Sequence, residues 1–373
     1  MRKVKTPIFG QRGFSLVELM VGMVIGLLTV LVITQVMALS EGKKRTTALG
    51  SDAQVNGALA LFAIQRDVQQ SGYGADLSLS SLGCPVNYSY GGSAASSFTL
   101  APVVITDGTS GAPDTITVIQ GNSVGFSTPM VTTNDHAQSD SHFTVMSSLG
   151  AVAGNMMISV PTNWNNTTQE CTLFSITDTA GTGTALTATN LPHGTGTGNA
   201  AWNQSSTFPT AVVPAGSLLL NMGPMVKRTY SINAAGNLQT ADFSSATGAS
   251  TTQELYPQIV NLQALYGKDT VNTTRAVAVD TYDNVTPTDN AHWKQVISVR
   301  VAVVARSNQY EKDVVTSTAP LWNVGGAIPV AGSTTCYTNS KCIALDVSGL
   351  TDWQHYRYKV YDTTIPLRNV LWN

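Results

Sequence analysis

The most regular hydrophobic pattern in the chain is an apolar segment near its start, residues 14–39, which reads FSLVELMVGMVIGLLTVLVITQVMAL. Its 26 residues contain one charged side chain, Glu18. About 20 consecutive apolar residues are enough for a helix to cross a bilayer. The segment therefore predicts a membrane-spanning helix, and the basic residues before it predict that its N-terminal side stays in the cytoplasm.

The helical pattern continues after this segment but becomes amphipathic over residues 40–70. The apolar positions at near-helical spacing are Leu49, Val55, Leu59 and Phe62, followed by Arg66. No proline occurs between Phe14 and Gly74, and the glycines at 72 and 74 are typical of a helix end. We expect residues 40–72 to form the second half of one long helix, with this apolar stripe packed on a globular domain.

From residue 73 to the end, the pattern changes to short apolar runs separated by polar loops, which indicates β-strands. The clearest run is 296–306, where Ile and Val alternate with other residues as in a central antiparallel strand. The predicted strands are 98–105, 115–120, 143–146, 156–161, 172–176, 217–220, 228–232, 259–266, 296–306 and 355–361. The segment 181–204 is rich in Gly and Thr and predicts an exposed loop. The expected class is α+β: a long N-terminal helix packed on one elaborated antiparallel β-sheet domain, 73–373.

Composition narrows the class of protein. Charged residues make up 11% of the chain, against a usual fraction of about 25%. This favours an extracytoplasmic β-rich protein over a cytoplasmic helical enzyme. The formal net charge is −2, and all four basic residues before Phe14 lie in a stretch without acids, so the remainder is more acidic. A mildly acidic body argues against nucleic-acid binding, which usually requires a basic face.

The four cysteines, at 84, 171, 336 and 342, allow three disulfide pairings. An even, small number in an exported chain favours disulfides over free thiols. Cys336 and Cys342 enclose only five residues, so a local bridge between them is favoured, which leaves Cys84 with Cys171. A zinc site is disfavoured because no Cys-x-x-Cys spacing or nearby histidine accompanies these residues.

No catalytic constellation emerges from the sequence, and no cofactor is expected. The chain has no Gly-x-Ser-x-Gly elbow, phosphate-binding loop or His-Glu-x-x-His motif. His136 and His142 lie near Asp135 and Asp140, but a solvated loop is favoured there over a metal site. Four aspartates could contribute to a calcium site, although their spacing does not fit an EF-hand; they are Asp269, Asp280, Asp283 and Asp289. Tyr356, Tyr358 and Trp372 are expected to pack on a sheet face.

The segment Gly13-Phe14-Ser15-Leu16-Val17-Glu18 is unusual because a small residue stands before the apolar core, whereas secretory signals are cut after it. With the long apolar helix that follows, it resembles the leader of type IV prepilins and type II secretion pseudopilins. The resemblance implies that prepilin peptidase cuts between Gly13 and Phe14, removing residues 1–13, and that Phe14 is then N-methylated.

The resemblance also implies a role for Glu18, facing the N-terminal amine of a neighbouring subunit inside a filament. Charge pairing would compensate the cost of burying a carboxylate in an apolar bundle. The simpler alternative is a Glu tolerated near the headgroups, where it favours the helix dipole. Gly22 and Gly26 form a Gly-xxx-Gly pair that permits close helix contact, which is a weak signal alone.

Several later segments resemble PilW-type minor pilins: residues 64–73, 171–174, 260–267, 299–301 and 366–369. This resemblance implies a minor pilin that primes type IV pilus assembly and sits at or near the pilus tip. The implied partners are other minor pilins, the major pilin, prepilin peptidase, the inner-membrane assembly machinery and a tip adhesin. The implied location is the inner membrane, with the C-terminal domain in the periplasm, and the pilus after assembly. The alternatives are a minor pseudopilin of a type II secretion system or, less favoured, a membrane-anchored ligand-binding domain.

Overall fold

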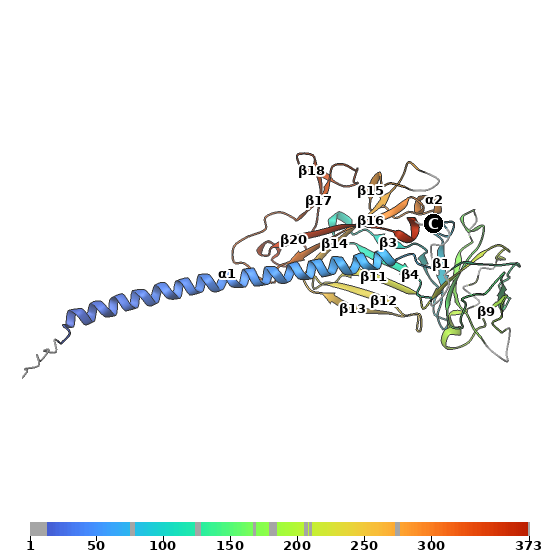
Figure 1. Cartoon of the computed structure of the whole chain (residues 1–373), viewed down its shortest axis with the longest axis horizontal. Helices are drawn as coiled ribbons and strands as arrows, with labels where there is room; N and C mark the ends of the chain where they lie inside the picture. The colour runs from blue at the N-terminus through green and yellow to red at the C-terminus, as the bar shows by residue number, and fades with distance from the viewer. Residues whose placement is uncertain are drawn as a thin grey trace, which may run out of the picture. The chain divides into compact units, whose positions relative to one another are not determined.

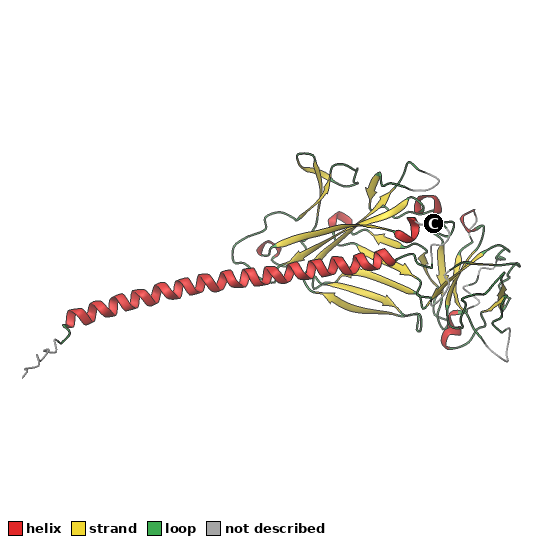
Figure 2. Ribbon diagram, in the orientation of Figure 1, coloured by secondary structure: helices red, strands yellow, loops and turns green. Residues whose placement is uncertain are grey.

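The structure, a computed structural model, describes residues 13–74, 79–123, 128–166, 169–178, 185–204, 208, 211–272 and 277–371. The predicted leader, apart from Gly13, and Trp372 lie outside these residues. The chain divides into two compact units, Met1–Ser51 and Asp52–Asn373, and helix α1 (Leu16–Gln70) contributes to both. The predicted α+β class and the long N-terminal helix are confirmed, since strands make up most of the regular structure of the second unit (Figure 2).

Within the described residues, the second unit contains five sheets, and Figure 1 labels some of their strands. The six-stranded sheet has the order β2 (Ser96–Thr99), β1 (Pro85–Tyr88), β8 (Cys171–Ser175), β7 (Met156–Val160), β10 (Leu218–Gly223) and β5 (Met130–Val131). The five-stranded sheet has the order β13 (Ser250–Tyr256), β12 (Leu238–Phe243), β11 (Val226–Ile232), β4 (Thr115–Gln120) and β3 (Val103–Thr106).

The four-stranded sheet has the order β15 (Thr281–Asp283), β14 (Ile259–Lys268), β16 (Val296–Arg306) and β20 (Tyr358–Pro366). Two small sheets consist of β17 (Leu321–Gly325), β19 (Ser340–Ala344) and β18 (Thr334–Tyr337), and of β6 (His142–Thr144) and β9 (Asn190–Pro192). Neighbouring strands pair antiparallel except β1 and β8, which are parallel. The short helices are η1 (Thr109–Gly111), η2 (Trp164–Asn166), η3 (Gly198–Trp202), α2 (Asn290–Trp293), η5 (Trp353–His355) and α3 (Arg368–Leu371).

The strand predictions succeed where the pattern is regular and fail at turns. β4 and β16 have the predicted bounds, and β16 is central in its sheet. The single strand predicted over 98–105 is wrong, because the chain bends at Ala101 and Pro102, between β2 and β3. The strand predicted from His355 begins only at Tyr358, since His355 belongs to η5.

Two disulfides lie in the second unit, with the pairs favoured from the sequence. Cys84, just before β1, is bonded to Cys171 at the start of β8, and both are fully buried. Cys336 in β18 is bonded to Cys342 in β19. The first bond joins positions 87 residues apart, so it closes a long loop of the unfolded chain and removes much of its conformational entropy.

The second half of α1 packs against two sheets at once. In Figure 1 it runs beside β11 and β12 and beside β14 and β20. Its buried side chains are Ala53, Ala60, Ile64 and Val68, which share one core with Tyr230 of β11 and Val301 of β16. This is not the predicted stripe: Val55, Leu59 and Phe62 are 52%, 44% and 63% exposed. The predicted face is wrong because the prediction was based on the largest apolar side chains.

The inner face of α1 uses small residues because the helix lies very close to the sheet. A Cβ atom placed on Gly57 would lie 2.5 Å from the ring of Tyr361 in β20 and 3.1 Å from the Cβ of Ala305 in β16. A larger residue at 57 would have to displace the Tyr361 ring and press on Ala305. The close approach therefore favours a glycine here, and the larger side chains that face inward, Ile64 and Val68, lie farther along the helix.

A buried polar network fixes the end of α1 to the five-stranded sheet. The carboxylate of Asp67, which is buried, accepts hydrogen bonds from Arg228 Nη1 and from the Tyr230 hydroxyl, each at 2.7 Å. Arg228 also donates to Asp242 on β12, at 2.6 and 3.1 Å. Burial, followed by the nearby Asp67 carboxylate, raises the pKa of Tyr230 well above its usual value, so it remains a donor.

A second buried carboxylate joins the five-stranded and four-stranded sheets. Asp114, immediately before β4, accepts hydrogen bonds from the backbone N–H groups of Gly108 at 2.8 Å and of Ala264 in β14 at 2.7 Å. Burial raises the pKa of Asp114 to about 7 despite these bonds. The two sheets that hold α1 are thus joined to each other by a polar contact as well as by the shared core.

The network around Asp67 predicts that two carboxylates on the same arginine contribute unequally to stability. Asp67→Ala leaves the buried Tyr230 hydroxyl and one arm of Arg228 without their partner, so we expect a loss of about 3 kcal/mol in the free energy of unfolding. Asp242 is more exposed, and Asp242→Ala should cost about 1 kcal/mol or less. Urea unfolding of both variants, followed by tryptophan fluorescence, measures the difference; equal losses would contradict the assignment to burial.

Candidate functional site

The start of α1 is formed by a reciprocal pair of side chain–backbone contacts. Ser15 Oγ accepts a hydrogen bond from the backbone N–H of Glu18 at 3.2 Å, and Glu18 Oε2 accepts one from the backbone N–H of Ser15 at 3.4 Å. This is a capping box, which satisfies two N–H groups that a helix start leaves unpaired. The peptide between Gly13 and Phe14 precedes the helix, and the Cβ position of Gly13 has no neighbouring atom within 4 Å.

The helix after this cap has the dimensions of a membrane span and no cover from its own chain. The apolar part is Leu16–Glu41, 26 residues, and none of it is buried. Thr29 and Thr34 donate their hydroxyl hydrogen bonds to the carbonyls of Ile25 and Leu31, at 2.7 and 2.8 Å. These two hydroxyl groups are therefore satisfied inside the helix, as an apolar surrounding requires.

Small residues leave parts of this helix surface open. Cβ atoms placed on Gly22 and Gly26 would meet nothing within 4 Å. The backbone at these two positions is accessible to the backbone of another helix. The first unit thus has an exposed apolar helix with a capped start, and its site is a packing surface without an enclosed cavity.

Comparison with known proteins agrees with this geometry. Residues 8–34 match the family model of the prokaryotic N-terminal methylation motif, and residues 226–369 match the model described as type IV pilus-assembly protein W. Together the two matches support a type IV pilin-like minor pilin of the PilW type that carries a prepilin leader motif. The matched segments contain the start of α1 and all strands from β11 to β20.

Two further comparisons concern whole proteins. No curated protein matches the chain. Among solved structures, a type IV-like pilin from Thermus thermophilus matches with 9% sequence identity, covering 85% of this chain and 96% of that one, at a TM-score of 0.30.

The four aspartates considered for calcium do not form one site in this PilW-type pilin. Asp269 accepts from backbone N–H groups of its own loop, Asp280 binds Thr270, Asp283 pairs with Lys268, and Asp289 caps α2. The bonds from Val277 and Asn272 hold the pKa of Asp269 well below its usual range. Among the described residues, no three His, Cys, Asp or Glu side chains are placed to hold a metal ion.

The expectation of a solvated loop around His136 is wrong. His136 is 3% exposed and His193 is 5% exposed, and their Nε2 atoms lie 2.8 Å apart. The pair is surrounded by the rings of Phe143, Phe174 and Phe208. One imidazole must donate its Nε2–H to the lone pair of the other, so the contact requires at least the accepting ring to be neutral. Sequence reasoning missed His193 because it lies in the segment interpreted as an exposed Gly/Thr-rich loop.

This pair predicts an acid-sensitive region. Burial lowers the pKa of His136 to about 4 and of His193 to about 3, below the unfolded value near 6.5. Their contribution to stability is therefore complete above about pH 6.5 and is lost as the pH falls toward 4. At pH 4 the loss for His136 is on the order of 3 kcal/mol.

Hydrogen exchange at pH 7 and pH 4 tests this locally. Amides of β6 and β9 should lose protection in acid, while those of β16 should keep it. The double variant His136→Gln/His193→Gln retains a donor and an acceptor without titrating in this range, so its β6 and β9 amides should stay protected. Equal acid loss in the variant and the parent would contradict the role of the pair.

Proposed function

We propose that this PilW-type pilin primes type IV pilus assembly from the inner membrane and occupies the tip, or a place near it, in the finished filament. The uncovered apolar helix after Gly13 is the observation that carries the proposal. A helix of this kind is stable in only two surroundings, a bilayer and a bundle of similar helices. A subunit that passes from one to the other exchanges lipid contacts for helix contacts.

The leader supports this sequence of events. Cleavage between Gly13 and Phe14 would remove the basic residues and leave the apolar helix at the new N-terminus. Phe14 would then carry the N-methylated amine. The domain following the helix would face the periplasm, because the positive residues before the span favour the cytoplasm.

Glu18 has two tasks in this proposal. Its backbone N–H and carboxylate complete the cap with Ser15 in the free subunit. In the filament, the carboxylate would pair with the N-terminal ammonium of a neighbouring subunit, where both charges are desolvated together. The cap has a neutral equivalent, since Gln also serves at this position of a capping box, whereas the charge pair has none.

The outward stripe of Val55, Leu59 and Phe62 gives the second unit a packing surface of its own. These side chains lie at positions i, i+4 and i+7, on one face of α1, and their own domain leaves them exposed. Partners with similar helices, namely other minor pilins and the major pilin, would cover such a stripe. A minor pseudopilin in a secretion system would use the same surfaces, and we treat it as an outcome of the tests.

The first test is the mass of the mature N-terminus. Protein extracted from membranes should begin at Phe14 and carry one methyl group on its amine. The control is the same chain from cells without prepilin peptidase, which should retain residues 1–13. A mature chain that begins at another residue would exclude the filament function.

The second test separates the cap from the charge. We expect Glu18→Gln and Glu18→Ala both to be cleaved normally and both to reduce pilus number at least tenfold, because neither can form the charge pair. Asp52→Asn removes an exposed carboxylate farther along α1 and should leave piliation unchanged. Normal piliation with Glu18→Gln would show that only the cap matters. A loss of secretion with intact pili would favour the pseudopilin alternative.

A further inference from the structure

A hollow of about 370 Å³ opens in the part of the domain that neither family model covers. Its floor is apolar and consists of Val160, Pro161, Trp164 and Leu218. Its rim is polar and exposed, with Ser80, Thr162 and Asn165 and the backbone of Gly216. The volume lies at the lower end of the range of small-molecule sites, about 300–1,000 Å³.

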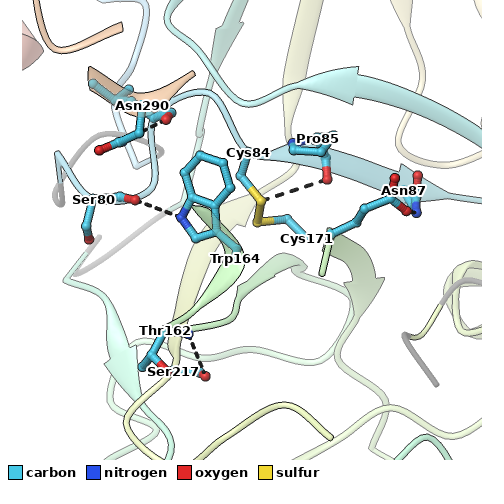
Figure 3. Close-up of a disulfide and its surroundings, with 11 residues drawn as sticks. Ser80, Cys84, Pro85, Asn87, Thr162, Trp164, Cys171, Ser217 and Asn290 are labelled. Atoms are coloured by element: carbon cyan, nitrogen blue, oxygen red, sulfur yellow. Dashed lines mark hydrogen bonds between the residues drawn. A yellow bond between two sulfur atoms is a disulfide. The ribbon is translucent and has the colours of Figure 1, made fainter. Parts of the chain in front are cut away.

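The floor is held by the core beneath it. Trp164 belongs to the same buried cluster as Cys84 and Cys171, and its indole Nε1 donates to the carbonyl of Ser80 at 2.8 Å. Figure 3 shows the Trp164 ring between Ser80 and the disulfide. With 8% of its surface accessible, Trp164 can present only an edge to a ligand. Its ring cannot rotate without breaking the bond to Ser80.

The opposite wall is fixed as well. The backbone N–H of Thr162 donates to Ser217 Oγ at 3.2 Å, which joins the end of β7 to the start of β10 (Figure 3). Gly216 has a φ of +86°, and a Cβ atom there would lie 3.7 Å from the Thr162 methyl group. Gly216 thus adopts a backbone conformation that residues with a side chain rarely adopt, and it leaves this part of the rim without a side chain. The hollow is therefore preformed.

The chemistry of the lining selects the class of ligand. No acidic, basic or histidine side chain is among the described residues that line the hollow, so a charged ligand would lose its hydration without a counter-charge. Hydroxyl, amide and backbone groups ring an apolar floor, which suits a molecule with one C–H face and a hydroxylated edge. We propose that this hollow binds a single uncharged pyranose ring, as a subsite for a neutral glycan.

The experiment is saturation-transfer NMR on the full chain in a detergent without a sugar headgroup. The probes are methyl glycosides of glucose, galactose and N-acetylglucosamine at millimolar concentration, with glucuronate as the charged counterpart. At least one neutral glycoside should receive saturation, and glucuronate should receive none. Absence of transfer to all three neutral probes, or equal transfer to glucuronate, would overturn the proposal. So would preferential binding of a Ser/Thr-rich peptide tested in the same way.

Variants at the rim test whether the glycoside binds in this hollow. Thr162→Trp fills the space from the rim and should weaken binding at least tenfold. Thr251→Trp, on the exposed strand β13, is the matched control and should bind as the parent does. Asn165→Ala removes one rim amide without adding volume, so a severalfold loss there supports the site even if Thr162→Trp folds poorly. Unchanged binding in both rim variants would overturn the assignment.

Discussion

The arrangement of this pilin depends on how closely α1 approaches the two sheets beneath it. Gly57 lies against Tyr361 and Ala305, and alanines occupy positions 53 and 60 of the same face. At this separation, only small side chains or ones placed between strands fit on the inner side. Around Gly57, the large side chains of Val55, Leu59 and Phe62 instead point outward, although their exposure to water is unfavourable. The constraint that attaches the helix to its domain thus also creates the surface through which we propose that it meets other subunits.

Polar contacts determine where along the sheets the helix is fixed. An apolar stripe of small residues can slide with little change in energy, whereas the bonds of Asp67 to Arg228 and Tyr230 exist in one register only. The end of the helix is held by backbone bonds as well: Gly72 N–H donates to Ile119 in β4, at 2.8 Å. Close packing stabilises the contact between helix and sheet, and the buried polar network determines the register of the helix along the strands.

The sequence allowed the helix and its most regular strands to be predicted, because their periods are long and uninterrupted. It did not show which face of α1 is buried, since that depends on the distance between helix and sheet, which Gly57 sets. β13 was missed because its polar residues are exposed on nearly all positions and show no alternation. The capping box could have been predicted, because Ser15 and Glu18 have the required spacing in the sequence. It was missed because these residues were interpreted only as part of the leader motif.

The domain divides its tasks between two groups of strands. The core that holds α1 contains side chains of the five- and four-stranded sheets, and most of these lie in the segment matched by the PilW model. Among the described residues, the cores around the Cys84–Cys171 bond and around His136 contain no side chain of α1. The hollow and the histidine pair can therefore change without a change in the side chains that pack on the helix. A protein whose helix must pack in a fixed way can vary its binding surface more freely when the helix and that surface are supported by separate cores. In this domain, the core that holds α1 is separate from the cores around the disulfide and the histidine pair.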